Sequence, residues 1–152
     1  MIKRLILFLV LNFGALTIGG LFTGEGVPSE WYQNMNKAPW TPPGWVFGTA
    51  WSTIMICFSF YMAYAIDRID SKKFIITLFS IQWVLNISWN PVFFYYQNTL
   101  LGLFIISSLT ILVGYMLFTF MRELSLKTLL LLPYVMWLMI ATSLNGYAWL
   151  YN

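Results

Sequence analysis

Five apolar stretches occupy most of the chain, and each is long enough to cross a lipid bilayer. They cover residues 5–22, 44–66, 74–96, 99–121 and 128–150. A bilayer hydrocarbon core of ~30 Å requires about 20 mostly apolar residues in a helix. With 60% hydrophobic and 9% charged residues, the chain lacks the polar side chains that would cover a water-soluble surface. The sequence predicts an all-α membrane protein in which residues 1–152 form one bundle of five transmembrane helices.

The basic residues predict the orientation of this bundle, because five spans place the two termini on opposite sides. Seven of the eight Lys and Arg residues fall on the side of the N-terminus, and only Lys37 falls on the other. Loops on the cytoplasmic side carry an excess of basic residues. We therefore expect a cytoplasmic N-terminus and an external C-terminus and first loop. No basic patch is continuous enough to follow a phosphate backbone, so nucleic acid is not an expected partner.

The first apolar stretch has a second interpretation, as a cleaved signal peptide. Lys3 and Arg4 precede it, as basic residues precede the apolar part of a signal peptide. The stretch ends in Gly19-Gly20-Leu21-Phe22, however, and has no small-x-small cleavage site there. We therefore favour a true first span.

Residue counts exclude several kinds of chemistry. The chain has no His, so it cannot use an imidazole base or a His-ligated metal or haem. Its single cysteine, Cys57, cannot form an intramolecular disulfide. All five acidic residues lie in loops, whereas ion-coupled transporters normally place a carboxylate within the membrane. We expect no metal, no bound cofactor and no hydrolytic chemistry.

The loop over residues 23–43 is much longer than the others and carries the aromatic residues Trp31, Tyr32 and Trp40. Ser29 is placed to cap a short helix that starts at Glu30. Loops of this length in a compact domain commonly act as lids or binding segments. The alternative is that the aromatic residues sit at the membrane interface, where Trp and Tyr are enriched. Both interpretations stay open at this point.

Prolines and small residues give further expectations. Thr41 is a candidate N-cap of the second span, with Pro42 in its first turn. Pro91 and Pro133 are each expected to bend a helix. Small residues at Ala15 and Gly19, or the Thr77 and Ser80 pair, offer two candidate faces for a homodimer.

Polar side chains within the spans are amides and indoles. Gln82, Asn86 and Asn90 follow at intervals of four and share one helical face, with Trp89 beside them. Similar stripes occur in the second and fifth spans, at Phe47, Trp51, Trp137, Ala141 and Asn145. Such groups must face protein or a wet cavity, because an unpaired amide in hydrocarbon costs several kcal/mol. They form either hydrogen bonds between helices or an aromatic-walled pocket that suits a large, flat, mostly apolar ligand.

Three segments carry a resemblance to a known family. Residues 37–51 read KAPWTPPGWVFGTAW, residues 85–94 read LNISWNPVFF, and residues 132–137 read LPYVMW, followed by Leu144-Asn145. Together they resemble the motifs of the translocator protein family, also called tryptophan-rich sensory protein or peripheral-type benzodiazepine receptor. The resemblance covers essentially the whole chain, and the minimal length indicates a bacterial member, placed in the cytoplasmic membrane.

The resemblance implies a five-helix bundle, usually dimeric, with an internal ligand cavity closed by the first loop. Family members bind porphyrins such as protoporphyrin IX and benzodiazepine-type ligands, and some bacterial members are said to degrade protoporphyrin in light. Trp51 and Trp137 match the tryptophans associated with that reaction. Further matches to positions around the ligand pocket are Tyr32, Pro42, Asn86, Trp89, Ala141 and Asn145.

Two departures from the family pattern affect the expected ligand. Tyr147 is followed by no basic residue, so the sterol motif of animal members is incomplete. Asn90 stands where many relatives carry Pro or an aromatic residue, and adds an amide to the predicted pocket. Three functions remain: a porphyrin-binding membrane receptor or sensor, a light-dependent porphyrin-degrading enzyme, and a facilitated transporter of tetrapyrroles or lipids. Expected partners are a porphyrin or similar flat molecule, membrane lipid and a second copy of the chain.

Overall fold

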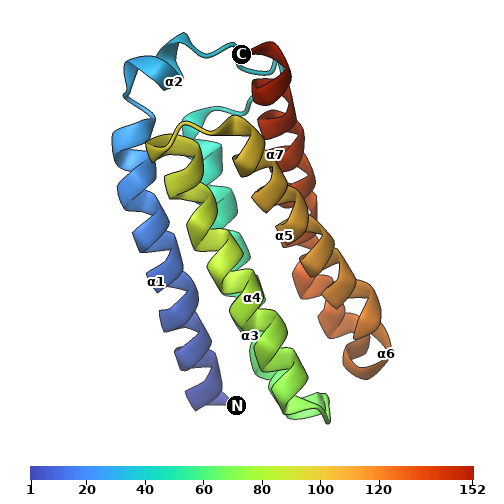
Figure 1. Ribbon diagram of the computed structural model, residues 1–152. Helices are drawn as coiled ribbons and strands as arrows, with labels where there is room; N and C mark the ends of the chain where they lie inside the picture. The colour runs from blue at the N-terminus through green and yellow to red at the C-terminus, as the bar shows by residue number, and fades with distance from the viewer.

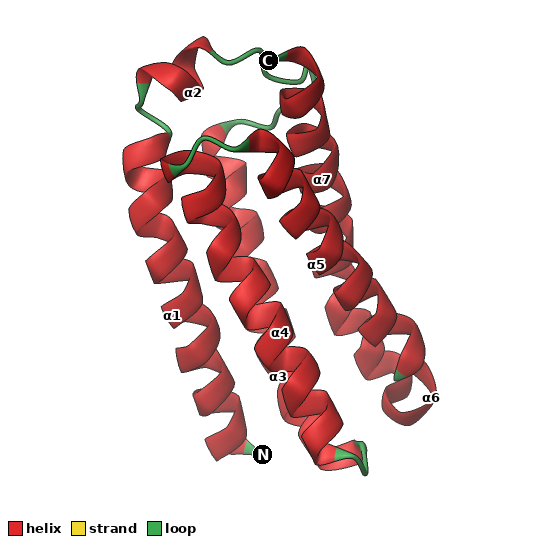
Figure 2. Cartoon of the chain, in the orientation of Figure 1, coloured by secondary structure: helices red, strands yellow, loops and turns green.

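The computed structural model describes residues 1–152 and consists of helices and the loops that join them (Figures 1 and 2). The elements in chain order are α1 (Ile2–Gly26), α2 (Glu30–Asn34), α3 (Gly44–Arg68), α4 (Lys72–Asn90), the π-helix η1 (Pro91–Tyr95), α5 (Thr99–Thr119), α6 (Met121–Leu124), the 3₁₀ helix η2 (Ser125–Leu131) and α7 (Leu132–Tyr151).

The five long helices form a closed ring. α1 packs against α3 and α4, α5 packs against α4 and α7, and α7 returns to α3 (Figure 1). Short connections make α3 and α4, and α4 and α5, run antiparallel; α4 packs on α5, whereas α3 and α4 touch little because α1 lies between them. α4 therefore runs parallel to α1, and the stripes on α3, α4 and α7 face a common interior.

Four segments are long and apolar enough to cross a membrane: Ile2–Gly26, Gly44–Arg68, Thr99–Thr119 and Met121–Tyr151. The remaining long helix, α4, has 19 residues. It is less apolar because it carries two lysines and three amides, yet it packs between α1 and α5 and continues into η1. Its outer face is apolar, with Ile76, Ile81 and Val84 about half exposed. The prediction of an all-α membrane bundle is confirmed, and the protein is an integral membrane protein.

The core is aromatic where α3, α4 and α7 meet. Phe58 lies 5.4 Å from Tyr134 and 5.9 Å from Phe79, measured between ring centroids. Between α1 and α3, Asn12 donates a buried hydrogen bond to Ser59 across 2.9 Å. In a bilayer, close packing and hydrogen bonds of this kind hold helices together, since the lipid is as apolar as the side chains.

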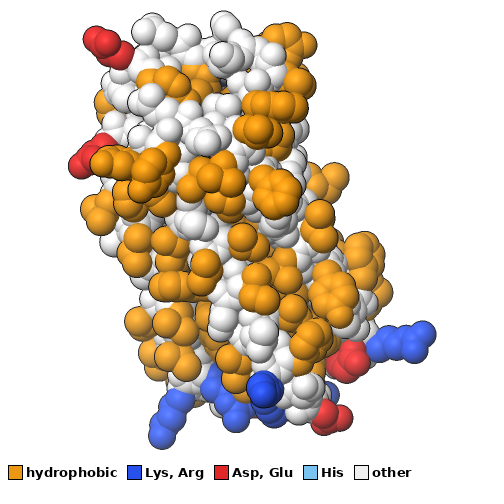
Figure 3. Space-filling view, viewed as in Figure 1, with side chains coloured by type: hydrophobic (Ala, Val, Ile, Leu, Met, Phe, Trp, Pro, Cys, Tyr) orange, Lys and Arg blue, Asp and Glu red, His pale blue; other side chains and the backbone are white.

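The charged residues mark the two ends of the bundle. Figure 3 shows the Lys and Arg side chains gathered at the end where the N-terminus lies, with apolar side chains covering the flank above. This end comprises the start of α1, the α3–α4 turn and the α5–α7 connection. The opposite end carries loop one, the segment between α1 and α3, and includes Lys37.

Several local expectations require correction. Pro133 is the second residue of α7, where its missing N–H costs nothing, so it does not bend the helix. Pro91 does change the helix, because it begins η1, in which Tyr96 N–H donates to the Pro91 carbonyl.

Thr41 is not the N-cap of α3; that position is Pro43. Ala15 and Gly19 are buried inside the bundle, so they are not a free surface for a homodimer.

Candidate functional site

Loop one closes one end of the helix ring. Ser29 caps α2 as predicted, since its hydroxyl accepts from the Tyr32 N–H at 3.3 Å. α2 holds Trp31 against Phe93 and Tyr32 against Phe94, with 5.5 Å between ring centroids in both pairs. We call Trp31, Tyr32 and the buried Met35 the loop-one plug. The lid interpretation is therefore favoured for Trp31 and Tyr32, whereas Trp40 and Trp45 stay exposed.

A second attachment ties loop one to the end of α7. The Asn36 N–H donates to Asn152 Oδ1 at 2.8 Å, and Asn36 Nδ2 donates to the Tyr151 carbonyl at 3.0 Å. Asn152 Nδ2 returns a bond to the Asn36 carbonyl at 3.2 Å. These three bonds form what we call the Asn36–Asn152 latch. Trp40 adds a bond to Ser143 at 3.1 Å.

Tyr32 lies where the plug meets the solvent-facing side of loop one. The ammonium of Lys37 is 4.5 Å from the centre of its ring, within the range of a cation–π contact. Burial raises the pKa of the Tyr32 phenol above its ordinary value of 10.0. The phenol is therefore neutral at physiological pH.

Beneath the plug, an indole and an amide join α4 to α7. Trp89 stacks on Phe93 at 4.9 Å, and its indole N–H donates to Asn145 Oδ1 at 2.9 Å. Asn145 Nδ2 donates in turn to the carbonyl of Thr99, at the start of α5, at 2.8 Å. Gly102 on α5 allows this close approach, because a Cβ there would lie 3.1 Å from Asn145 Oδ1. One amide thus holds three helices together.

Deeper in the bundle, aromatic side chains of α3 and α7 face one another. Phe47 and Trp137 are 5.2 Å apart between ring centroids, and Trp51 and Tyr134 are 6.0 Å apart. Gln82 of α4 donates to the Tyr134 hydroxyl at 2.6 Å.

Two buried polar atoms in this region have no hydrogen-bond partner in the protein: Trp137 Nε1 and Gln82 Oε1. Their side chains are 6% and 1% exposed. A buried donor or acceptor without a partner costs about 1–3 kcal/mol. Each such atom in a native protein calls for an explanation, and a bound water, ion or ligand that supplies the missing bond is one.

The structure brings most of the predicted site residues together in two layers. Tyr32, Trp89 and Asn145 lie at or under the plug, where Asn86 is also buried. The deeper layer contains Phe47, Trp51, Gln82 and Trp137. Ala141 is half-buried on α7, one turn beyond Trp137. Pro42 is half-buried just before α3 begins.

Asn90 is oriented differently from the other amides. Its Oδ1 accepts from the Thr23 hydroxyl at 2.9 Å, and its side chain fills the space next to Gly19, both on α1. Its amide nitrogen approaches the Asn86 carbonyl at 3.5 Å. The structure therefore gives Asn90 a role in helix–helix contact between α1 and α4.

Comparison with known proteins decides the family. The sequence pattern of the TspO/MBR family matches residues 6–150. The chain belongs to the TspO/MBR family. It is 35% identical over 136 residues to the tryptophan-rich protein TspO of Archaeoglobus fulgidus, covering 88% of this chain and 87% of that protein. It is also 30% identical over 118 residues to the tryptophan-rich sensory protein of Cereibacter sphaeroides, covering 78% and 74%.

A mammalian relative extends the comparison. The chain is 30% identical over 143 residues to the human translocator protein, covering 87% of this chain and 80% of that protein. These matches confirm the family assignment made from the three motifs. The names of these relatives support a membrane sensor or translocator role for this TspO/MBR member.

Sequence reasoning did not place several residues of this TspO/MBR site. Met35 of the plug gave no signal in the sequence, since the cluster that it forms with Phe93, Phe94 and Ala148 joins loop one to η1 and α7. Tyr134 stands in the motif of residues 132–137, three residues before Trp137, but the motif gives it no partner. Its hydroxyl is nonetheless the partner of Gln82. The Thr99 carbonyl could not be foreseen, because no side-chain pattern reports a backbone acceptor.

The latch gives a first testable expectation. Replacing Asn152 with alanine removes two side-chain bonds to Asn36. Each such bond contributes about 1 kcal/mol, so the loss of both should make opening of loop one about 30-fold more frequent. Hydrogen exchange of the amides of residues 35–43 measures this. Asn34→Ala is the control, because Asn34 is exposed at the end of α2, and it should leave the exchange rates unchanged.

Proposed function

We propose that this protein is a membrane receptor for porphyrins, with protoporphyrin IX as the first ligand to test and benzodiazepine-type molecules as further ligands. The observation that carries the proposal is the pair of buried atoms without partners, Trp137 Nε1 and Gln82 Oε1, in an aromatic interior. A ligand with an apolar, flat ring and few polar atoms suits both the ring faces and these two atoms.

Entry of such a ligand requires loop one to move. Trp31 and Tyr32 occupy the end of the ring by packing on Phe93 and Phe94. Lys37 is the basic residue at this end, whereas the other seven Lys and Arg lie at the opposite end. A porphyrin propionate at the mouth of the site would pair with Lys37 once α2 is displaced.

The orientation in the membrane is part of the proposal. The basic end is placed at the cytoplasmic side by the excess of Lys and Arg there. Loop one and the C-terminus then face outward from the cytoplasmic membrane of a bacterium. A homodimer is proposed as well; Ala15 and Gly19 cannot form its interface, because both are buried within the bundle.

A titration of tryptophan fluorescence with protoporphyrin IX in the dark tests the receptor proposal. We expect saturable quenching, and about three- to tenfold weaker binding for Trp137→Phe, because the variant keeps the ring and loses one hydrogen-bond donor. Trp45→Phe is the matched control, since Trp45 lies on α3 and is 73% exposed. Absence of saturable quenching by the folded protein would exclude porphyrin as a ligand.

Light-dependent degradation of the porphyrin is a second candidate function. It is favoured by the contact of Trp51 with Tyr134, which places an indole and a phenol side by side at the site. Light would excite the bound porphyrin, molecular oxygen would oxidise it and be reduced, and Trp51 and Tyr134 would lie against the reacting ring. Illumination should then yield new absorbing products with the parent protein and fewer with Trp51→Phe. Equal product formation by both would exclude a direct role for Trp51.

Facilitated transport of tetrapyrroles gives a different result. Sealed proteoliposomes that contain the protein would take up protoporphyrin IX faster than empty vesicles. A receptor that only binds would show saturable binding with no change in the rate of uptake.

A further inference from the structure

A groove runs between α1 and α4 at the basic end of the bundle, on the opposite half from loop one. It has a volume of about 540 Å³, within the ~300–1,000 Å³ range of ligand pockets. Eight of its ten lining residues are hydrophobic, and they include Leu7, Phe8 and Leu11 on α1 and Ile76, Phe79 and Trp83 on α4.

The floor and the inner end of the groove are fixed by contacts between the two helices. Phe8 packs edge-on against Phe79 at 5.0 Å between ring centroids and forms the floor. The Trp83 indole N–H donates to the Leu11 carbonyl at 3.0 Å and bridges the helices further along. The rim residues Leu7 and Val84 are 53% and 59% exposed, so the groove faces the lipid.

The dimensions of the groove match one leaflet of a bilayer. From Arg4 to Leu11 on α1, and from Ile76 to Val84 on α4, the lining covers seven and eight residues of helix rise. At 1.5 Å per residue this is about 10–12 Å. Half of an ~30 Å hydrocarbon core is ~15 Å. An acyl chain that starts at the charged end therefore has most of its length alongside the groove.

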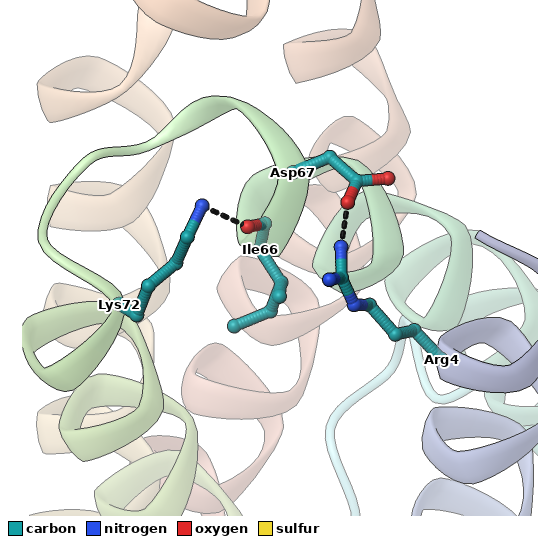
Figure 4. Close-up of polar contacts among 4 residues, drawn as sticks. All are labelled: Arg4, Ile66, Asp67 and Lys72. Carbon is teal, nitrogen blue, oxygen red and sulfur yellow. Dashed lines mark hydrogen bonds and ion pairs between the residues drawn. The ribbon is translucent and has the colours of Figure 1, made fainter.

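Charged side chains lie at the outer end of the groove (Figure 4). Arg4, which lines the groove, forms an ion pair with Asp67 at the end of α3. Lys72 donates to the carbonyl of Ile66, which also lines the groove. The Arg4 and Asp67 side chains remain 45% and 34% exposed, so Arg4 keeps donors free for another anion.

The charge of this end is unbalanced. The start of α1 and the α3–α4 turn carry five basic residues, Lys3, Arg4, Arg68, Lys72 and Lys73, against two acidic residues, Asp67 and Asp70. Basic pockets between membrane helices attract anionic headgroups, at about 1 kcal/mol per Lys or Arg near the surface.

We propose that the groove binds an anionic phospholipid, with one acyl chain between α1 and α4 and the phosphate at Arg4. The lipid supplies both an apolar chain and a negative charge, as the groove requires. A second copy of the protein is the competing occupant, because Ser80 of the groove lies one turn from Thr77. Pairing two copies along this groove would bring their basic ends together, which costs energy, whereas the phosphate offsets the charge.

The ion pair offers a test in which two substitutions act in opposite directions. Arg4→Gln removes the proposed phosphate ligand, so affinity for phosphatidylglycerol should fall about fivefold, the ratio that corresponds to ~1 kcal/mol. Asp67→Asn frees Arg4 from its partner, so affinity should rise two- to fivefold. If the ion pair only holds α1 to α3, both substitutions would change lipid binding in the same direction.

Native mass spectrometry of the purified full chain, titrated with phosphatidylglycerol or phosphatidylcholine, measures these affinities. We expect phosphatidylglycerol to be preferred, and Val84→Trp to weaken binding of both lipids by filling the groove. Arg122→Gln is the control for net charge, since Arg122 is exposed in α6, away from the groove, and it should have no effect. Circular dichroism confirms that each variant is folded.

Three outcomes would overturn the proposal. The first is equal affinity for the two lipids, and the second is unchanged phosphatidylglycerol binding by Arg4→Gln. The third is a dimer that Val84→Trp dissociates without any change in lipid binding, which would assign the groove to a second copy of the chain.

Discussion

Replacing Gly26 with alanine should destabilise this protein more than alanine at any other of its helical glycines. Gly26 is the last residue of α1 and lies directly on Phe94 of η1. An added Cβ would lie 2.5 Å from both Cβ and Cγ of Phe94. Because Phe94 Cβ is fixed to the backbone, a change of rotamer cannot relieve the overlap, and α1 must move away from η1.

Overpacking of this kind costs about 1–3 kcal/mol, which corresponds to a fall in Tm of roughly 2–12 °C for a chain of this size. A thermal melt in detergent, followed by circular dichroism, measures it. Gly24→Ala is the matched control: it lies two residues earlier in α1, and a Cβ there meets nothing within 4 Å. This control should be neutral or slightly stabilising, because Ala favours helix over Gly. Equal Tm values for both variants would contradict the packing of α1 on η1.

The second large effect is expected for Asn145→Ala. The substitution leaves the Trp89 indole N–H without its partner and removes the side-chain bond to the Thr99 carbonyl, where α4, α5 and α7 meet. Measured interhelical hydrogen bonds in membranes contribute about 0.6–2 kcal/mol each. Loss of both should lower the free energy of unfolding by about 2 kcal/mol, and porphyrin affinity should fall as Trp89 loses its fixed orientation.

A double-mutant cycle separates the bond from the rest of the side chain. Trp89→Phe keeps an aromatic ring on Phe93 and removes the donor. With this variant as background, Asn145→Ala should cost less than it does in the parent protein, because the Trp89 bond is already absent. Additive costs would show that Trp89 and Asn145 do not interact.

The five-helix bundle could be predicted because it follows from the length and apolar composition of separate stretches, which can be read along the sequence. Each span is about the length that a bilayer requires, and the α2 start followed from Ser29 and its neighbours. Residue type alone gave one wrong prediction at the start of α3. Thr41 has the side chain of an N-cap, but its hydroxyl donates to the Ala38 carbonyl within loop one. Pro133 suggests a bend within a span, but the 3₁₀ helix η2 ends just before α7 and Pro133 lies in the first turn of α7.

The site could be predicted only as faces of separate helices. The stripes on α3, α4 and α7 indicated polar groups that had to face protein, but not which groups would pair. Whether a polar side chain bonds to a neighbouring helix or faces a pocket depends on which groups lie next to it in the folded protein, and this differs from residue to residue. Asn90 and Asn145 are both amides, and one is bonded to α1 while the other joins α4 to α5 and α7. Trp137 Nε1 has no partner at all.

Loop one is attached to the bundle at two places, and each attachment is made to a different helix. Trp31 and Tyr32 lie on η1, the continuation of α4, while Asn36 is held by the last residues of α7. Inside the bundle, Trp89 and Asn145 set the separation of these same two helices. A molecule wedged between them would alter the span that loop one has to bridge. A ligand in the interior would thus change the distance between η1 and α7, and with it the conformation of loop one at the surface.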